Sequence, residues 1–349
     1  MTGVGKHHLR RLLLDFRDRF AVPALGAATV TRTGTLAVDV VGSRQRGGCD
    51  PVTVDDQWHI GSCAKAITSA LYARLVEQGD TEWAVPVRAF FPDLADSLDV
   101  GWSGPTVDEV LVCRSGMRTN LSRAELLKAW EDTSPMTEQR TRAVVSALSR
   151  PPDRRGAFRY SNLGYVIVGA AIDRIAEMPF EDALRINLLE PLGITSAGFG
   201  PPPDIWGHRP RFQLGSLTIG RGSPAEPGSP RSDNPAVLTP AGRLHLTLAD
   251  WAKFQQLFLN QGHDLLKPAT IEHLLTLPAD KSRGMAMGWA SAANLDGASY
   301  GMQGSNTLWA ATAIIDANLD RTAMVVANDG RTRLLSQSAQ LAASILRSH

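Results

Sequence analysis

Strand-like segments occur at both ends of this sequence, and helix-like segments fill the middle. Near the start, residues 25–32 and 35–41 are apolar, β-branched runs on either side of Thr33-Gly34, which is a hairpin pattern. Near the end, residues 299–304, 307–315 and 322–328 have the pattern of three successive strands. The two ends are therefore expected to form one sheet, with the middle of the chain inserted as a helical domain.

The middle segments have helical periodicity and are broken by proline and glycine. We expect helices near residues 106–112, 121–130, 137–148, 163–178 and 180–189, and another at 244–261 with Thr247 as an N-cap. The predicted fold class is α+β, with an antiparallel sheet flanked by helices. We assign residues 1–82 and 240–349 to the sheet domain and residues 83–239 to the mainly helical domain.

Residues 200–240 form a long stretch without periodicity. They hold nine of the 21 prolines, and glycine and serine fill much of the rest. A stretch of this kind is a functional loop, a lid or a locally disordered segment. Within it, Trp206, His208 and Phe212 are candidates either for the mouth of a substrate site or for packing of the loop.

The composition excludes several classes of protein. Hydrophobic residues make up 43% and charged residues 20% of the 349, and the net charge of +1 gives no reason to expect nucleic acid or a membrane surface as partner. Residues 1–20 lack a secretory apolar core, and no apolar run reaches transmembrane length. Cys49, Cys63 and Cys113 have no metal-ligand spacing. We expect a cytoplasmic protein without metal or cofactor.

A possible nucleophile precedes the most apolar helix-like run. Ser62 and Lys65 stand three residues apart at the start of the run that ends at Gly79, so they share one face of a helix. The helix N-terminus brings backbone N–H groups and a positive dipole end near the serine oxygen. Such a hydroxyl is a nucleophile if a neighbouring amine takes its proton. A pattern this short also arises by chance.

A second motif, Tyr160-Ser161-Asn162, offers a phenol and a side-chain amide two residues apart. The phenol could share the serine proton if the fold brings it to Ser62. The chain has only four tyrosines, so a chance Tyr-x-Asn is uncommon.

Three motifs in order carry a family resemblance. Residues 60–65 (Ile-Gly-Ser-Cys-Ala-Lys), 160–162 (Tyr-Ser-Asn) and 301–306 (Gly-Met-Gln-Gly-Ser-Asn) resemble those of the class C β-lactamase-type serine hydrolases. That family includes penicillin-binding-protein-like esterases and D-amino-acid peptidases. The similarity extends from about residue 22 to about residue 347, and it implies the β-lactamase/transpeptidase-like fold.

The resemblance implies a role for each matched residue. Ser62 would be the acylated nucleophile and Lys65 its proton acceptor, and Tyr160 would act as general base and as acid for the leaving group. Asn162 would orient Lys65 and bind a substrate carbonyl or amide. The backbone N–H groups of Ser62 and Ser305 would form the oxyanion hole.

Other residues of the third motif are candidates for contact with substrate. Gly304 precedes Ser305, and Trp309 follows as core or pocket wall. The family's third motif usually begins with Lys or His, and this chain has Met302, which carries no charge and donates no hydrogen bond. We therefore expect a neutral acyl substrate, or a weakened enzyme, rather than a β-lactam or a carboxylate-bearing peptide.

Two further patterns are better explained without catalysis. Gly297-Ala298-Ser299-Tyr300-Gly301 matches the Gly-x-Ser-x-Gly elbow, but an elbow needs a helix after the serine, and a strand-like run follows here. His59 is expected to be a strand-end residue rather than a catalytic base.

Three functions remain open on the sequence. The first is a serine hydrolase, of esterase or amidase type, that cleaves a small-molecule ester or amide through a Ser62 acyl-enzyme. The second is an acyltransferase of specialised metabolism that hands the same acyl group to an amine or alcohol. The third is an inactive relative that binds a ligand or protein, suggested by Met302. The sequence leaves the oligomeric state open.

Overall fold

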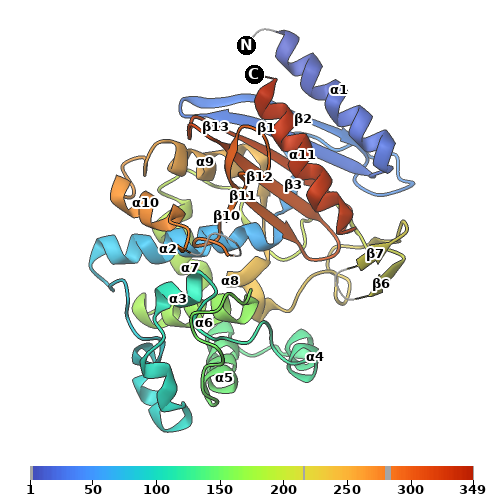
Figure 1. Ribbon diagram of the computed structural model, residues 1–349. Helices are drawn as coiled ribbons and strands as arrows, with labels where there is room; N and C mark the ends of the chain where they lie inside the picture. Colours follow the sequence, from blue (N-terminus) through green and yellow to red (C-terminus); the bar gives the residue numbers. More distant parts are fainter. Residues whose placement is uncertain (1–2, 215–216, 280–283, 349) are drawn as a thin grey trace.

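The computed structural model describes residues 3–214, 217–279 and 284–348, and its main element is a six-stranded antiparallel sheet (Figure 1). The strands, in their order across the sheet, are β10 (Ala290–Ser291), β11 (Ala298–Ser305), β12 (Ala310–Asp316), β13 (Arg321–Ala327), β1 (Ala24–Thr31) and β2 (Gly34–Gly42). Strand β1 pairs with β13, with Leu25 opposite Ala327. The two ends of the chain thus share one sheet, which confirms the predicted α+β class.

Both faces of the sheet are buried. Along β1, Leu25 and Ala27 belong to one hydrophobic cluster, and Ala28 and Val30 belong to another, as the two-residue period of a strand requires. Helices α1 (Gly3–Phe20) and α11 (Arg333–Arg347) cover the first face (Figure 1). Helix α9 (Leu248–Leu259) packs on the second face against β1 and β2. It begins at Thr247, whose side chain accepts the Asp250 N–H, as predicted.

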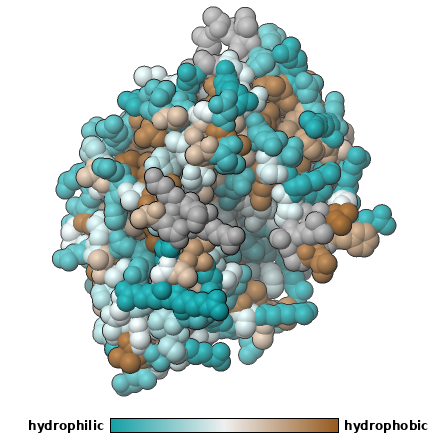
Figure 2. Space-filling model, viewed as in Figure 1, coloured by the Kyte–Doolittle hydropathy of each residue, from teal (hydrophilic) through white to brown (hydrophobic). Residues whose placement is uncertain are grey.

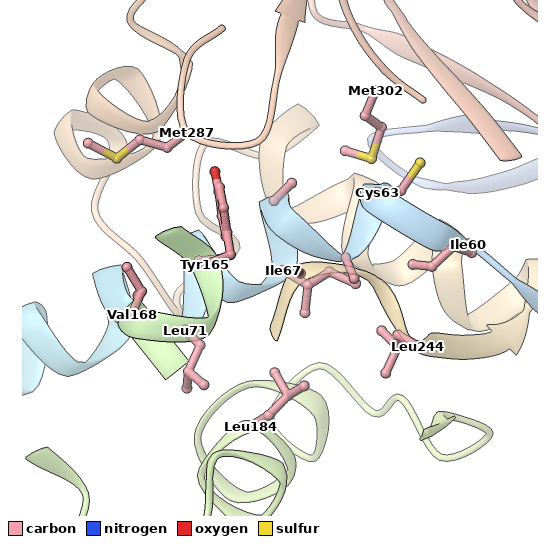
Figure 3. Close-up of a cluster of buried hydrophobic side chains, with 14 of the residues drawn as sticks. Ile60, Cys63, Ile67, Leu71, Tyr165, Val168, Leu184, Leu244, Met287 and Met302 are labelled. Atoms are coloured by element: carbon pink, nitrogen blue, oxygen red, sulfur yellow. The ribbon is translucent and has the colours of Figure 1, made fainter. Parts of the chain in front are cut away.

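Helix α2 (Ala64–Gln78) lies below the second face and is buried on nearly all sides. Figure 3 shows Ile67 and Leu71 of this helix within a cluster that also contains Tyr165, Leu184 and Leu244. Gly79 closes the helix at φ 84°, a left-handed conformation that favours glycine. The start of α2 is therefore held rigidly by packing along its whole length.

The middle of the chain is helical. Its helices are α3 (Val107–Leu111), α4 (Arg123–Glu131), α5 (Met136–Leu148), α6 (Asn162–Ile175), α7 (Phe180–Leu184) and α8 (Thr239–Gly242), and α10 (Pro268–Leu275) follows α9. The fully buried Arg140 of α5 binds Asp173 of α6 at 2.7 Å and Glu181 of α7 at 3.0 Å. This buried charge cluster joins three helices. No helix in the described part of the chain has the length and hydropathy needed to span a membrane.

A small second sheet connects the helical region to the start of α2. Strand β3 (Gln57–His59) pairs with β9 (Leu244–Thr247), which also pairs with β4 (Gly198–Phe199). The expected helix over 244–261 is therefore wrong for its first four residues, because they pair with β3 and β4 instead. This sheet sets the position from which β3 leads into Ser62.

The proline-rich stretch contains short paired strands. Strand β5 (Gly207–His208) pairs with β8 (Pro224–Ala225), and β6 (Phe212–Leu214) pairs with β7 (Leu217–Ile219). Phe212, Leu214 and Ile219 are exposed, and Figure 2 shows brown side chains gathered where this hairpin projects. Phe212 lies on the outside of the molecule and lines no cavity beside Ser62.

His208 packs inside the loop rather than at a substrate mouth. Its ring is buried, Nδ1 donates to the Asn328 carbonyl at 2.6 Å, and Nε2 accepts the Arg46 N–H at 3.0 Å. Nε2 can accept this hydrogen bond only while the ring is neutral. Burial accordingly lowers the pKa of His208 from 6.5 to about 4.

This shift predicts a loss of stability in mild acid. Between pH 6.5 and 4 the unfolded chain binds a proton on His208 that the folded chain does not, so the free energy of unfolding should fall as the pH falls through this range. The expected contribution is about 3 kcal/mol. Urea unfolding at several pH values should show a flatter profile for His208→Gln than for the wild type, whereas the exposed control His7→Gln should follow the wild type. Parallel profiles for wild type and His208→Gln would contradict the prediction.

Candidate active site

The structure brings the three predicted catalytic side chains together. Ser62 lies in η1 (Gly61–Cys63), a single turn that leads directly into α2. Its Oγ lies 3.1 Å from Lys65 Nζ, one turn along the same helix. Tyr160, just before α6, donates its hydroxyl to Ser62 Oγ at 2.8 Å. A proton can therefore move between the serine oxygen and either neighbour without a change in the fold.

Lys65 is 1% exposed and is held by neutral acceptors. Its Nζ donates to Asn162 Oδ1 at 2.7 Å and to the Ala241 carbonyl at 2.5 Å, besides Ser62. The ammonium has three N–H donors, so these contacts use all of them. The ring of Tyr160 lies 4.9 Å away. No carboxylate in the described parts of the chain forms an ion pair with Lys65.

Asn162 begins α6 and connects Lys65 to a residue that sequence reasoning missed. The Ser161 side chain caps this helix by accepting the Gly164 N–H at 2.8 Å. The Asn162 amide nitrogen donates to Asn120 Oδ1 at 2.8 Å. Asn120 comes from the segment before α4 and carries no motif, so its role becomes visible only once the chain is folded.

Two glycines let β11 approach the start of α2. A Cβ atom on Gly304 would lie 2.0 Å from the Ile60 carbonyl oxygen and 2.6 Å from the Ser62 nitrogen. A Cβ atom on Gly61, which has φ 51°, would lie 2.5 Å from the Ser305 nitrogen. Real Cβ contacts are not that short. The close approach brings the backbone of Ser305 next to that of Ser62, which the predicted oxyanion hole requires.

Two cavities meet at Ser62. The first, of about 410 Å³, is lined mostly by apolar residues; they include Phe158, Tyr160, Met285, Leu295, Met302 and Ile314. The second, of about 450 Å³, is more polar; its lining includes Asn120, Trp130, Asn162, Arg209, Arg231 and Ser305. Ser62 lines both cavities, so a bound ester or amide can extend to either side of the serine oxygen.

Met302 and Trp309 have different positions relative to these cavities. Met302 extends from β11 toward the start of α2, where Cys63 lies (Figure 3), and it lines the first cavity. Trp309 is fully buried, lines neither cavity and stacks on His59 with ring centroids 5.3 Å apart. Trp309 thus lies in the core, the first of the two positions expected from the sequence, and outside both cavities.

A buried network joins the segments that carry Ser62 and Ser305, the predicted oxyanion-hole residues. His59 accepts the Gly61 N–H on Nδ1 at 3.1 Å and contacts Asp233 Oδ2 through Nε2 at 3.0 Å. Asn306 donates to the other Asp233 oxygen at 2.7 Å. Burial opposes ionisation of Asp233, but His59 and Arg243 outweigh it, and the pKa of Asp233 is lowered. His59, at the end of β3, makes no hydrogen bond to Ser62.

We predict that this network affects turnover as well as stability. The two Asp233 oxygens accept hydrogen bonds from His59 and Asn306. In Asp233→Asn an NH₂ group, which can only donate, replaces one of these oxygens, so one of the two hydrogen bonds is lost. The expected cost is about 2 kcal/mol in unfolding free energy. We also expect about a tenfold lower kcat, because Gly61 and Asn306 adjoin Ser62 and Ser305, the predicted oxyanion-hole residues. Urea unfolding and ester kinetics measure the two effects. Asp204→Asn, an exposed change in the same stretch, is the control. A stability loss with unchanged kcat would mean that Asp233 only holds the fold.

Metal chemistry has no evident ligand set here. In residues 3–214, 217–279 and 284–348, no three His, Cys, Asp or Glu side chains are grouped so as to share a metal ion.

Comparison with known proteins gives the family. The family model described as Beta-lactamase matches residues 16–346. Penicillin-binding protein 4 of Amycolatopsis lactamdurans is 26% identical over 251 residues, covering 70% of this chain and 62% of that protein. The Unguisins hydrolase ungD' of Aspergillus campestris is 25% identical over 258 residues, covering 72% of this chain and 47% of that protein. The chain thus spans less than two thirds of either relative.

A solved structure supports the same fold. The D-amino acid amidase from Ochrobactrum anthropi SV3, in complex with D-phenylalanine, superposes with a TM-score of 0.75 at 18% identity and covers 97% of this chain and 99% of its own. At this identity the likeness concerns the fold alone. Together with the family match, it confirms the resemblance and the fold predicted from the three motifs.

Proposed function

This chain belongs to the beta-lactamase family, a family of serine hydrolases, and we propose that it hydrolyses a small-molecule ester or amide through an acyl group carried on Ser62. The observation that carries the proposal is the contact of Ser62 Oγ with both Lys65 Nζ and Tyr160 OH, at 3.1 and 2.8 Å. A relative named as a hydrolase supports the same reaction class. The proposal includes a cytoplasmic location, which the three unpaired cysteines support.

The reaction proceeds in two balanced halves. In the reactive form Lys65 is a neutral amine. Ser62 Oγ attacks the carbonyl carbon and gives its proton to the Lys65–Tyr160 pair, and the oxyanion accepts hydrogen bonds from the Ser62 and Ser305 N–H groups. The bond to the leaving group breaks, and the leaving oxygen or nitrogen takes a proton from Tyr160. Water then attacks the acyl-enzyme and gives a proton to the same pair, and the proton returns to Ser62 as the acid leaves.

The position of Tyr160 predicts which cavity holds the leaving group of the substrate and which holds its acyl group. Tyr160 lines the first cavity but not the second. Because the leaving group must reach the proton of Tyr160, it belongs in the first cavity. The acyl group then extends into the second cavity, past Asn162.

Covalent labelling tests the proposal. Incubation with a fluorophosphonate, followed by intact-protein mass and peptide mapping, should give one adduct on Ser62 and none in the Ser62→Ala variant. Nitrophenyl esters should be turned over by the wild type only. A folded protein that takes no label and turns over no ester would contradict the proposal and favour the inactive binding relative.

An acyltransferase is the second candidate. The first cavity, once the leaving group has left, is open to an amine or alcohol that could take the acyl group instead of water. Addition of a primary amine during ester turnover separates the two activities. Amide formation that exceeds hydrolysis at millimolar amine would establish transfer as the main reaction.

A further inference from the structure

The second cavity contains two arginines that the catalytic steps do not use. Arg209 lies at the β5 end and Arg231 lies just before Asp233, and both line this cavity together with Ser62. The Arg209 guanidinium donates to the Arg231 carbonyl, which ties the two positions together. The Arg231 guanidinium lies over the Trp130 ring at 5.3 Å, and Trp130 in turn donates to the Asp233 carbonyl at 2.9 Å. Both arginines are therefore anchored at the cavity wall.

The positive charge of these arginines is not neutralised within the described chain. Neither Arg209 nor Arg231 forms an ion pair with a carboxylate of residues 3–214, 217–279 or 284–348. Asp233 is the one acidic residue among the described lining. Its two oxygens are taken by His59 and Asn306, its side chain is 2% exposed, and Arg243 lies 3.5 Å away. The cavity thus has a net positive wall.

The first cavity has the opposite character. Met302 stands where the family usually has a cation, and Lys65, the one charged residue in the described lining, is used by Ser62, Asn162 and Ala241. Among the described lining residues, the cations that Ser62 does not use therefore lie in the second cavity, on the acyl side. Unpaired arginines of this kind bind carboxylates in bidentate geometry.

We propose that the second cavity selects an acyl group that carries a carboxylate, with Arg209 and Arg231 as the residues that bind it. The inference rests on the function proposed above and names its substrate class: an ester or amide with an apolar leaving group and an anionic acyl chain. It revises the expectation of a neutral acyl substrate, which follows from Met302 alone. Met302 restricts the leaving group, and the acyl group meets the arginines.

Matched esters with one leaving group test the proposal. The 4-nitrophenyl monoester of adipic acid and 4-nitrophenyl hexanoate share the six-carbon acyl chain and differ by the terminal carboxylate. We expect kcat/KM to favour the anionic ester by about tenfold in 50 mM NaCl, and the preference should shrink in 500 mM NaCl because salt screens exposed charges. Arg209→Gln and Arg231→Gln should each reduce the preference by about fivefold.

The control is Arg221→Gln, which removes an exposed arginine from the same stretch but outside both cavities. This variant should keep the wild-type preference. A wild-type enzyme without preference, or a preference that all three variants share, would overturn the proposal while leaving ester hydrolysis established.

A binding measurement separates this inference from the catalytic one. Calorimetry with the Ser62→Ala variant should show that adipamate, the monoamide of adipic acid, binds about tenfold more tightly than hexanamide, and that Arg231→Gln in the same background reduces the difference to about twofold. If this result were obtained while no ester is turned over, the anion site would stand and the hydrolase proposal would fail. Equal binding of the two amides would overturn the anion site.

Discussion

Replacement of Lys65 by alanine is expected to lower kcat/KM for ester substrates by about 10³-fold. Lys65 Nζ is 3.1 Å from the nucleophilic oxygen, and it is the one amine in the described lining of the site. Without it, the serine proton has only Tyr160 as acceptor. Asn162 Oδ1 also loses the hydrogen bond that Lys65 Nζ donates to it. Steady-state kinetics and the rate of fluorophosphonate labelling should fall together, because both depend on the first attack by Ser62.

Two further variants separate proton transfer from charge and from folding. Lys65→Arg keeps a positive charge but cannot give up a proton at any ordinary pH, so it should be about as inactive as the alanine variant. Near-wild-type turnover by Lys65→Arg would contradict the assignment of Lys65 as proton acceptor. Lys128→Ala removes an exposed lysine of α4 and should behave as the wild type. Unfolding curves are needed, because loss of the buried amine leaves the Ala241 carbonyl unpaired at a cost of about 1–3 kcal/mol.

The nucleophile and its neighbours were predictable because each lies in a short motif whose spacing is set by one helix. Ser62 lies in the turn η1 that leads into α2, one helical turn before Lys65, and Asn162 is the first residue of α6, two positions after Tyr160. Most of the sheet was predictable for a related reason: strands such as β1 and β12 are largely apolar over eight and seven residues, and this pattern occurs at both ends of the chain. The two-residue strand β10 was not predicted.

The rest of the site depends on approaches between distant segments. Asn120, Asp233 and Arg231 come from stretches without periodicity. No local pattern predicts that Asn120 contacts Asn162, that Asp233 contacts His59 or that Arg231 lines the second cavity. The proline-rich stretch was expected to lack regular structure, yet β5–β8 and β6–β7 form there because backbone pairing depends on which segments meet. Four-residue strand β9 was missed because its apolar residues continue into α9 without a break.

Gly304 allows a direct test of whether the Ser305 N–H stabilises the oxyanion. Gly304→Ala is expected to lower kcat by about 10²-fold or more. Its Cβ would lie 2.0 Å from the Ile60 carbonyl oxygen, and that oxygen belongs to backbone that cannot rotate away. The end of β11 must therefore move from the start of α2, and the Ser305 N–H moves with it. Since the oxyanion forms only after attack, the loss should appear mainly in kcat rather than in KM.

Thermal unfolding and kinetics on the same Gly304→Ala sample test this assignment, with kcat measured well below the unfolding midpoint. Gly48→Ala is the matched control, because its Cβ would meet nothing closer than the Gln45 carbonyl at 3.3 Å, in a loop outside both cavities. A Gly304→Ala enzyme that unfolds earlier but retains kcat within about twofold would show that Ser305 does not stabilise the oxyanion. In that case Gly61 and Gly304 would serve only the packing of β11 on α2. Displacement of a hydrogen-bond donor that contacts the transition state lowers kcat by far more than twofold.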